Sequence, residues 1–202
     1  MLKNRQKFDA SCDCHSVLKR AGGSLVVFSA FKFLVMKRVV IVRHGKSVPY
    51  GYEDDFNRDL RERGKNDARL VSNQLHKQGI VPDFIISSPA KRALKTARIF
   101  AKNLVYQGNI KEEPAIYNGL TTNEFIDLIR SLPNEVKNVF FFGHNPGFYY
   151  YVANLLNEFY GDMPTTSTVG INFDINNWKK VDARSGNLAF HLMPRMFKST
   201  AR

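Results

Sequence analysis

Short apolar runs alternate along this chain with longer stretches that carry apolar residues at helical spacing. Val39–Val42 is a β-branched run of the kind that a strand buried on both faces shows. Further strand-like runs cover residues 83–87, 139–142, 168–174 and 187–193. The spacing predicts four helices. One covers residues 64–78, and the second begins at an N-cap at Ser88, with Pro89 in its first turn, and ends at about Asn103. The third runs from Thr122 to just before Pro133, and the fourth covers residues 147–158.

This alternation predicts an α/β fold in layers, with a mostly parallel central sheet. The chain has 202 residues, of which 44% are hydrophobic, and this is enough for the core of one domain of ordinary size. We place the domain at residues 36–202 and treat residues 1–35 as an N-terminal extension.

The extension differs in character from the rest of the chain. It begins polar and basic, and then turns apolar from Ala21 to Val35 with an interruption at Lys32. Three interpretations stay open: a variable leader before a natural start at Met36, an extra strand or helix docked on the domain, or an export signal. The long basic stretch, Lys32 and the lack of a small-residue cleavage site weigh against export.

Both cysteines lie in this extension, in the sequence Cys12-Asp13-Cys14-His15. A zinc site needs a second pair of ligands, and none is evident. We therefore expect two incidental thiols and no metal. Residues 36–202 contain no cysteine, which is typical of a cytoplasmic protein.

The chain is strongly basic, with 30 Lys and Arg against 18 Asp and Glu and a formal net charge of +12. Such a charge suits nucleic acid, an acidic membrane surface or a phosphorylated substrate. Residues 36–202 show no basic helix with interleaved aromatic residues, no RNP sequence and no zinc finger, so we expect no nucleic-acid partner. No uncharged apolar run approaches the roughly 18 residues of a membrane span, so we expect no membrane partner.

Polar clusters follow three of the predicted strands. They are Arg43-His44-Gly45-Lys46-Ser47, Ser87-Ser88-Pro89-Ala90-Lys91-Arg92 and Gly143-His144-Asn145-Pro146-Gly147. Ligands of such sheets gather beyond the carboxyl ends of the strands. We therefore expect two histidines and two arginines to converge on one sheet edge, namely His44, His144, Arg43 and Arg92.

Arginine beside histidine favours a phosphate group over a metal ion. Guanidinium groups repel a cation, but they give planar, bidentate hydrogen bonds to a phosphate dianion. Helix N-termini just after Ser88 and Asn145 would add backbone N–H donors. Within such a cage, an imidazole that is neutral at one nitrogen and oriented at the other can attack phosphorus. The residues alone thus predict a phosphate-binding site that needs no metal or other cofactor.

Three motifs in this order resemble those of the histidine phosphatase superfamily, the phosphoglycerate-mutase-like proteins. They are Val-Arg-His-Gly-x-Ser after a buried strand, Ser-Ser-Pro-x-x-Arg-x-x-x-Thr, and Gly-His-Asn-Pro-Gly. The stretch Asp55-Phe56-Asn57-Arg58-Asp59-Leu60-Arg61-Glu62-Arg63-Gly64 is similar to one in phosphohistidine phosphatases of the SixA type. The resemblance covers about residues 37–194, and it implies a three-layer α/β/α sandwich.

The resemblance also implies a role for each motif residue. His44 would be the nucleophile and would carry the phosphoryl group on a ring nitrogen, in a mechanism without metal. Arg43 and Arg92 would bind the phosphoryl oxygens. His144 would contact the same group and stabilise charge in the transition state, and Asn145 would contribute to phosphate binding.

Two departures from the superfamily pattern bear on the substrate. Mutase-like and broad phosphatase members carry Arg-His-Gly-x-Ser-x-x-Asn, and here the last position is Tyr50. They also have an acidic residue after the third strand as general acid, where this chain has Asn118. An alkoxide leaving group needs such an acid at neutral pH. A phosphorylated histidine needs it less, because its imidazole, with a parent pKa of about 6.5, can be protonated before the P–N bond breaks.

These departures favour phosphohistidine on a protein, for example one of the histidine phosphotransfer type, as the substrate. The chain has no long insertion between residues 100 and 140 that could form a lid, so we expect an open pocket. A small phosphomonoester is the alternative substrate, and a phosphate-recognition module without turnover is a further alternative. A mutase is less favoured, since it needs an enclosed site and a general acid.

Other polar residues have less specific interpretations. Glu53, Asp54 or Asp55 could supply a proton to the leaving group, although Asp55 could equally pair with Arg58 or Arg63 at the surface. We expect structural or exposed positions for His76 and His191, and a packing role for Trp178.

Overall fold

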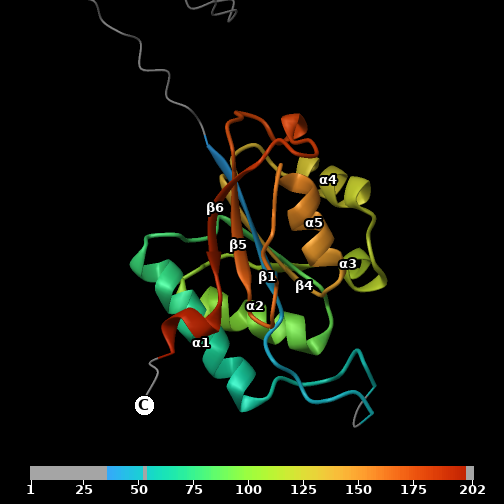
Figure 1. Ribbon diagram of the computed structural model, residues 1–202, viewed down its shortest axis with the longest axis vertical. Helices are drawn as coiled ribbons and strands as arrows, with labels where there is room; N and C mark the ends of the chain where they lie inside the picture. Colours follow the sequence, from blue (N-terminus) through green and yellow to red (C-terminus); the bar gives the residue numbers. More distant parts are fainter. Residues whose placement is uncertain (1–35, 52–53, 199–202) are drawn as a thin grey trace, which may run out of the picture. The chain divides into compact units, whose positions relative to one another are not determined.

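The computed structural model of the protein describes residues 36–51 and 54–198 (Figure 1). Six strands form one sheet with the order β3-β2-β4-β1-β5-β6. Strands β1, β2, β3 and β4 are parallel to one another, whereas β5 pairs antiparallel with both of its neighbours, β1 and β6. Their bounds are β1 Lys37–Arg43, β2 Phe84–Ser87, β3 Ile110–Glu112, β4 Asn138–Gly143, β5 Thr168–Phe173 and β6 Asn187–Leu192. The predicted mostly parallel sheet is confirmed.

Helices cover both faces of this sheet and complete three layers (Figure 1). Helices α1 and α2 pack on one face, and α3, α4 and α5 pack on the other. The α-helices are α1 Glu62–Lys77, α2 Lys91–Asn103, α3 Pro114–Asn118, α4 Thr122–Arg130 and α5 Gly147–Leu155. Two 3-10 helices follow, η1 Trp178–Lys180 and η2 Pro194–Phe197. The three-layer α/β/α sandwich is therefore as predicted.

Strand β1 shows why its sequence is apolar throughout. Val39 and Ile41 belong to the core under α3, α4 and α5, whereas Val40 and Val42 belong to the core under α1 and α2. All four side chains are fully buried. Successive side chains of a strand point to opposite faces, so a central strand between two helical layers needs apolar residues at every position.

The observed element boundaries correct some of the predicted ones. Ser88 is not the N-cap of α2, because the helix begins at Lys91 with Ala90 as its N-cap. Helix α5 ends at Leu155 rather than at residue 158. Thr121 caps α4 in a reciprocal capping box with Glu124, one residue before the predicted start. Strand β3 and helix α3 were not predicted, because both are too short to show a periodic apolar pattern.

Trp178 packs in the core as predicted. Its side chain is fully buried, and its Nε1 donates a hydrogen bond to the carbonyl of Val136 over 2.9 Å. The ammonium of the buried Lys37 lies 5.3 Å from the centre of the indole ring. The interpretations of residues 1–35, including those of Cys12 and Cys14, concern a part of the chain outside the described residues. No helix within 36–51 and 54–198 is long and apolar enough to cross a membrane.

Candidate active site

The parallel pairing of β1 and β4 brings the two predicted histidines together. Arg43 at the end of β1 is in register with Gly143 at the end of β4. His44 follows directly, and its N–H donates to the Gly143 carbonyl over 3.0 Å. The rings of His44 and His144 consequently lie with their centres 5.1 Å apart. The predicted convergence at this sheet edge is confirmed for these two side chains.

A backbone carbonyl fixes the tautomer of His44. Its Nδ1 lies 2.8 Å from the carbonyl oxygen of Gly45, and this contact is buried. A carbonyl oxygen only accepts hydrogen bonds, so the proton of a neutral imidazole must be on Nδ1. Nε2 is then the nitrogen with a lone pair, on a side chain that lines a cavity. This arrangement suits a nucleophile.

Both imidazoles are held in the neutral form. Burial lowers the pKa of His44 to about 4, and the positive charge of nearby arginines acts in the same direction. Burial likewise lowers the pKa of His144 to about 3, with the neighbouring His44 as the second cause. At neutral pH, therefore, the lone pair of His44 is available without deprotonation.

Ser88 orients His144 instead of capping a helix. Its Oγ lies 2.8 Å from Nε2 of His144, and its backbone N–H donates to the carbonyl of Phe142 in β4. The hydroxyl also accepts a hydrogen bond from the backbone N–H of Ala90 over 3.3 Å. Ser88 thus connects the end of β2 to the second histidine.

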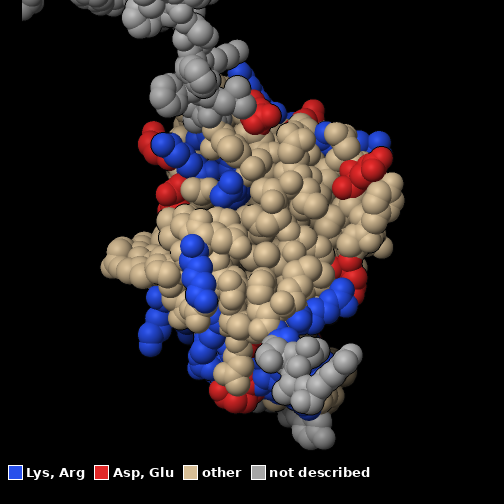
Figure 2. Space-filling model, turned by 60° about the vertical axis from the view of Figure 1, so that its left-hand side comes forward, with Lys and Arg blue, Asp and Glu red and all other residues tan. Residues whose placement is uncertain are grey.

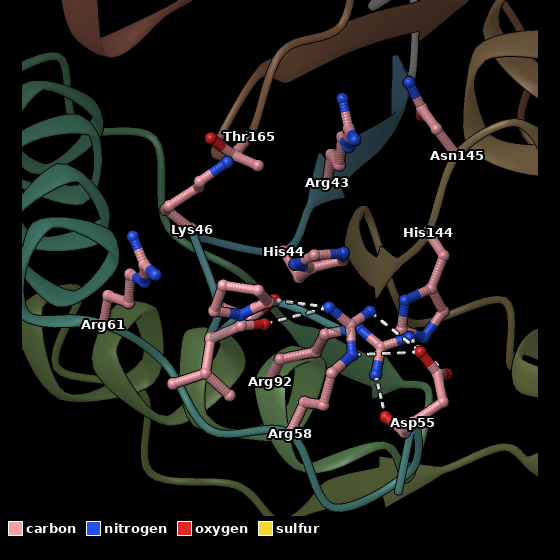
Figure 3. Close-up of a pocket in the computed structure, with 13 residues that line it drawn as sticks. Arg43, His44, Lys46, Asp55, Arg58, Arg61, Arg92, His144, Asn145 and Thr165 are labelled. Atoms are coloured by element: carbon pink, nitrogen blue, oxygen red, sulfur yellow. Dashed lines mark hydrogen bonds and ion pairs between the residues drawn. The ribbon is translucent and has the colours of Figure 1, made fainter. Parts of the chain in front are cut away.

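Arg92, in the first turn of α2, meets Asp55 from the loop between β1 and α1 (Figure 3). Nη2 of Arg92 lies 3.0 Å from Oδ2 of Asp55, and its Nη1 donates to the Asp55 backbone carbonyl. Arg58 forms an ion pair with the other carboxylate oxygen over 2.8 Å. Asp55 thus holds two guanidinium groups side by side next to His144.

The Asp55 carboxylate has a third partner that the sequence did not indicate. The hydroxyl of Tyr117 donates to Oδ2 of Asp55 over 3.0 Å, and the Tyr117 ring lies edge-on to His144 with the centres 5.9 Å apart. Partial burial would raise the pKa of Asp55, but hydrogen bonds from Arg92, Tyr117 and Arg58 outweigh it and lower that pKa. The carboxylate is therefore ionised at neutral pH.

Arg43 and Asn145 line the same cavity, but their side chains bind a backbone carbonyl instead of the Asp55 carboxylate. Nη1 of Arg43 donates to the carbonyl of Met163 over 2.7 Å, and Nδ2 of Asn145 donates to the same oxygen over 3.1 Å. Figure 3 shows both side chains apart from Arg58 and Asp55. The structure thus places all the predicted site residues around one cavity, with Arg43 and Arg92 on different sides of it.

The cavity has a volume of about 520 Å³. Five buried side-chain nitrogen or oxygen atoms in the described part of the chain have no hydrogen-bond partner, and four of them belong to residues that line it: Arg43 Nε, Arg92 Nε, His144 Nδ1 and Asn145 Oδ1. Buried polar groups in proteins are nearly always paired, so this concentration indicates a binding site. Exposed side chains such as Lys46 and Arg61 also line the cavity, so it opens to solvent there as expected.

Two glycines allow the first turn of α1 to pack directly on the backbone that follows β1. A Cβ atom on Gly45 would lie 2.8 Å from the carbonyl oxygen of Gly64, and one on Gly64 would lie 2.2 Å from that of Lys46. No side chain fits between these backbones. Gly45 of the Arg-His-Gly motif and Gly64 of the Glu-Arg-Gly motif are thus both required by this one backbone contact.

Several sequence interpretations are corrected or settled by these contacts. Asn118 is exposed and does not line the cavity, and Tyr117 beside it is the residue that reaches the site. Of the two pairings considered for Asp55, the one with Arg58 is observed. Arg63 pairs instead with Asp67, with Nε 3.7 Å from Oδ2. His76 is exposed, and His191 lies 2.8 Å from Ser167 Oγ, so both have the structural or exposed positions expected. Within the described residues, no three His, Cys, Asp or Glu side chains gather as a metal site would require.

Residues 39–140 match the family model of the histidine phosphatase superfamily (branch 1). The chain belongs to this superfamily. It is similar to the serine/threonine-protein phosphatase Pgam5, mitochondrial, of Drosophila grimshawi, with 32% identity over 84 residues, 41% of this chain and 29% of the fly protein. It is also similar to phosphoserine phosphatase 1 of Hydrogenobacter thermophilus, with 34% identity over 100 residues, 46% of each chain. The matched part thus spans less than half of the length of either relative.

Solved structures show the same fold. The protein histidine phosphatase SixA, complexed with tungstate, superimposes with a TM-score of 0.68 over 80% of this chain and 99% of that one. The sequence identity is 23%, so this likeness concerns the fold. It agrees with the three-layer arrangement described above for this member of the histidine phosphatase superfamily.

Proposed function

We propose that this protein is a phosphatase that removes the phosphoryl group from phosphohistidine on a protein, through a phosphohistidine intermediate on His44. The observation that carries the proposal is the hydrogen bond from Nδ1 of His44 to the Gly45 carbonyl. It leaves the lone pair on Nε2, in a cavity that also holds His144, Arg58 and Arg92. Membership of the histidine phosphatase superfamily supports the same chemistry.

The reaction has two displacements at phosphorus. In the first, Nε2 of His44 forms a P–N bond while the P–N bond to the substrate imidazole breaks, and that imidazole leaves in its protonated, neutral form. In the second, a water oxygen attacks the phosphorus, the bond to His44 breaks, and inorganic phosphate leaves. The guanidinium groups and His144 stabilise the charge on the phosphoryl oxygens in both steps.

The site favours a leaving group that brings its own proton. Among the described residues, Asp55 is the only carboxylic acid that lines the cavity, and it accepts hydrogen bonds from two arginines and a tyrosine. A carboxylate with a lowered pKa is a poor general acid at neutral pH. The imidazole of a phosphohistidine can be protonated before the bond breaks, so a phosphoramidate suits this site better than an ester.

A small phosphomonoester is the second candidate substrate. The similarity to phosphoserine phosphatase 1 of Hydrogenobacter thermophilus favours it. Tyr117 is the group that could assist an alkoxide leaving group, since its hydroxyl donates to Asp55 and its ring lies edge-on to His144. An enzyme of this kind would hydrolyse simple phosphate esters at rates at least comparable to those for phosphohistidine.

The test compares two substrates with the full-length protein in buffer that contains EDTA. One substrate is a histidine-phosphorylated phosphotransfer protein, and the other is an aryl phosphate. We expect preferential loss of phosphohistidine, its abolition in His44→Ala, and wild-type rates in His76→Ala, which removes an exposed histidine at the far end of α1. Turnover of the ester alone would assign the second function. Binding without turnover of either substrate would indicate a recognition module.

A further inference from the structure

Two cations extend the positive charge of the cavity away from the reacting histidine. Lys46 and Arg61 line the same cavity as His44. In Figure 3 they lie with Thr165 on one side of His44, whereas Asp55, Arg58 and His144 lie on the other. A phosphoryl group bound next to His44 and His144 would therefore leave this side of the cavity to another part of the substrate.

Backbone contacts hold these two side chains next to each other. The N–H of Arg61 donates to the carbonyl of Lys46 over 2.9 Å, and Ser47 pairs with Leu60 in an antiparallel bridge. Gly64 packs directly against the Lys46 backbone, as described above. Lys46, shortly after β1, and Arg61, at the start of α1, are thus held on two paired stretches of backbone. The backbone pairing itself keeps the two residues close together.

Neither side chain has a partner within the described part of the chain. The cations around them do: Arg58 and Arg92 pair with Asp55, and Lys91 and Lys95 pair with Asp59. No ion pair or side-chain hydrogen bond of Lys46 or Arg61 exists among residues 36–51 and 54–198, and both are exposed. Adjacent like charges without a counter-charge repel each other, so an anion bound between them would be stabilised.

The positive charge continues beyond Thr165, which also lines a neighbouring cavity of about 170 Å³. Three cations line this second cavity, Arg63, Arg195 and Lys198, and its acidic residue Asp67 is paired with Lys198 over 2.6 Å. Figure 2 shows Lys and Arg gathered at the lower end of the molecule, where β1 and β4 finish in Figure 1. A track of cations that leads away from the reacting group suits an extended segment better than a compact molecule.

We infer that Lys46 and Arg61 bind a carboxylate side chain of the substrate protein, an Asp or Glu that lies close to the phosphohistidine. The substrates would then be proteins whose phosphorylated histidine is in an acidic segment. This inference rests on the proposed function. It adds a second anion site that is separate from the phosphoryl site and acts on selection of the substrate.

The experiment uses two phosphohistidine peptides that differ only next to the phosphohistidine, where one has Glu and the other Gln at the flanking positions. The measured quantity is the ratio of kcat/KM for the two peptides with the full-length protein. We expect a preference of about tenfold for the Glu peptide, the size that two partly exposed ion pairs provide. In the Lys46→Gln/Arg61→Gln double variant the ratio falls to about one, through KM. High salt reduces the wild-type ratio.

Two controls separate charge at this position from charge in general. Lys77→Gln removes a cation at the other end of α1, about 24 Å from Arg61 at 1.5 Å per residue, and the ratio should stay at its wild-type value. The Lys46→Glu/Arg61→Glu double variant should reverse the preference when Lys replaces Glu in the peptide. The thermal unfolding midpoint of each variant shows whether it is folded.

The outcomes distinguish the two proposals. A wild-type protein that hydrolyses both peptides equally, or a folded double variant that keeps the preference, overturns the second anion site and leaves the proposed function intact. A wild-type protein that releases phosphate from neither peptide overturns the proposed function and this inference together. A Lys77→Gln variant that loses the preference as fully as the double variant also overturns the inference, because net charge then explains the result.

Discussion

The site combines two regions that are held in place in different ways. His44 and His144 follow two central strands, and hydrogen bonds such as His44 N–H to the Gly143 carbonyl fix them to the sheet. The loop residues 46–51 and 54–61, by contrast, are held in place by pairs such as Arg61 with Lys46 and by the ion pairs of Asp55. The strand ends carry the residues that we propose to react, and the loop carries charges that a substitution can change without disturbing the sheet.

The two regions also differ in charge. The histidines are neutral, because burial lowers their pKa values to about 4 and about 3. The loop supplies permanent charges from Asp55, Arg58 and Arg61. Arg92 connects the two regions, since it lies in the first turn of α2 beside the strand ends and its guanidinium binds Asp55. Variants in each region should therefore have different effects, and four predictions test this difference.

The largest effect is expected at the strand ends. His44→Ala removes the proposed nucleophile, and we expect the rate to fall by about 10⁴-fold or more, as when a residue of a catalytic unit is removed. Measurement of phosphate release from a phosphohistidine protein checks this. The variant should also retain no label after incubation with a radiolabelled phosphoryl donor. A His44→Ala enzyme with a few per cent of wild-type activity would show that another group attacks phosphorus.

The second-largest effect on activity is expected at Arg92, where the two regions meet. Arg92→Lys keeps the positive charge but loses the planar fork that binds Asp55 and, in the proposed reaction, a phosphoryl oxygen. We expect the rate to fall by about 10²–10³-fold, the usual result of removing one donor at a charged transition state. Lys91→Gln, which changes the neighbouring, partly exposed residue, is the matched control. If Arg92→Lys keeps activity within tenfold of wild type, the fork geometry is unimportant.

Acid should destabilise the strand-end region. The pKa of His44 is about 4 in the folded protein and about 6.5 in the unfolded chain, so the unfolded chain binds more protons between these values. Stability is therefore lost as the pH falls below about 6.5. From pH 7 to pH 5, His44 should cost about 2 kcal/mol in the free energy of unfolding, measured with urea. In His44→Asn the difference between the two pH values should shrink by this amount. An equal difference in both proteins would contradict the lowered pKa.

The sequence predicted the strand-end region much better than the loop. Arg43, His44 and His144 follow apolar runs that can only be buried strands, so their convergence follows from the topology of parallel sheets. The partners of Asp55 depend on how residues 54–61 fold back toward the strand ends, and no periodicity in the sequence encodes this path. Tyr117 was missed because it belongs to the five-residue helix α3. Its neighbour Asn118 was chosen from the position of the family motif, and a one-residue step on a helix turns a side chain by about 100°.

The smallest effect is expected in the loop. Asp55→Asn removes a negative charge that competes with phosphate for Arg58 and Arg92, while the amide still occupies the same space. We expect inorganic phosphate to inhibit the variant about tenfold more strongly, because one repulsive charge within hydrogen-bond distance of the guanidiniums is lost. The kcat should fall only a few-fold, since the histidines are unchanged. Product inhibition measured at several phosphate concentrations checks this, with Asp54→Asn on the same loop as the control. If phosphate binds Asp55→Asn more weakly, the main role of Asp55 is to position the two arginines, and the loop contributes to phosphate binding through geometry rather than through charge.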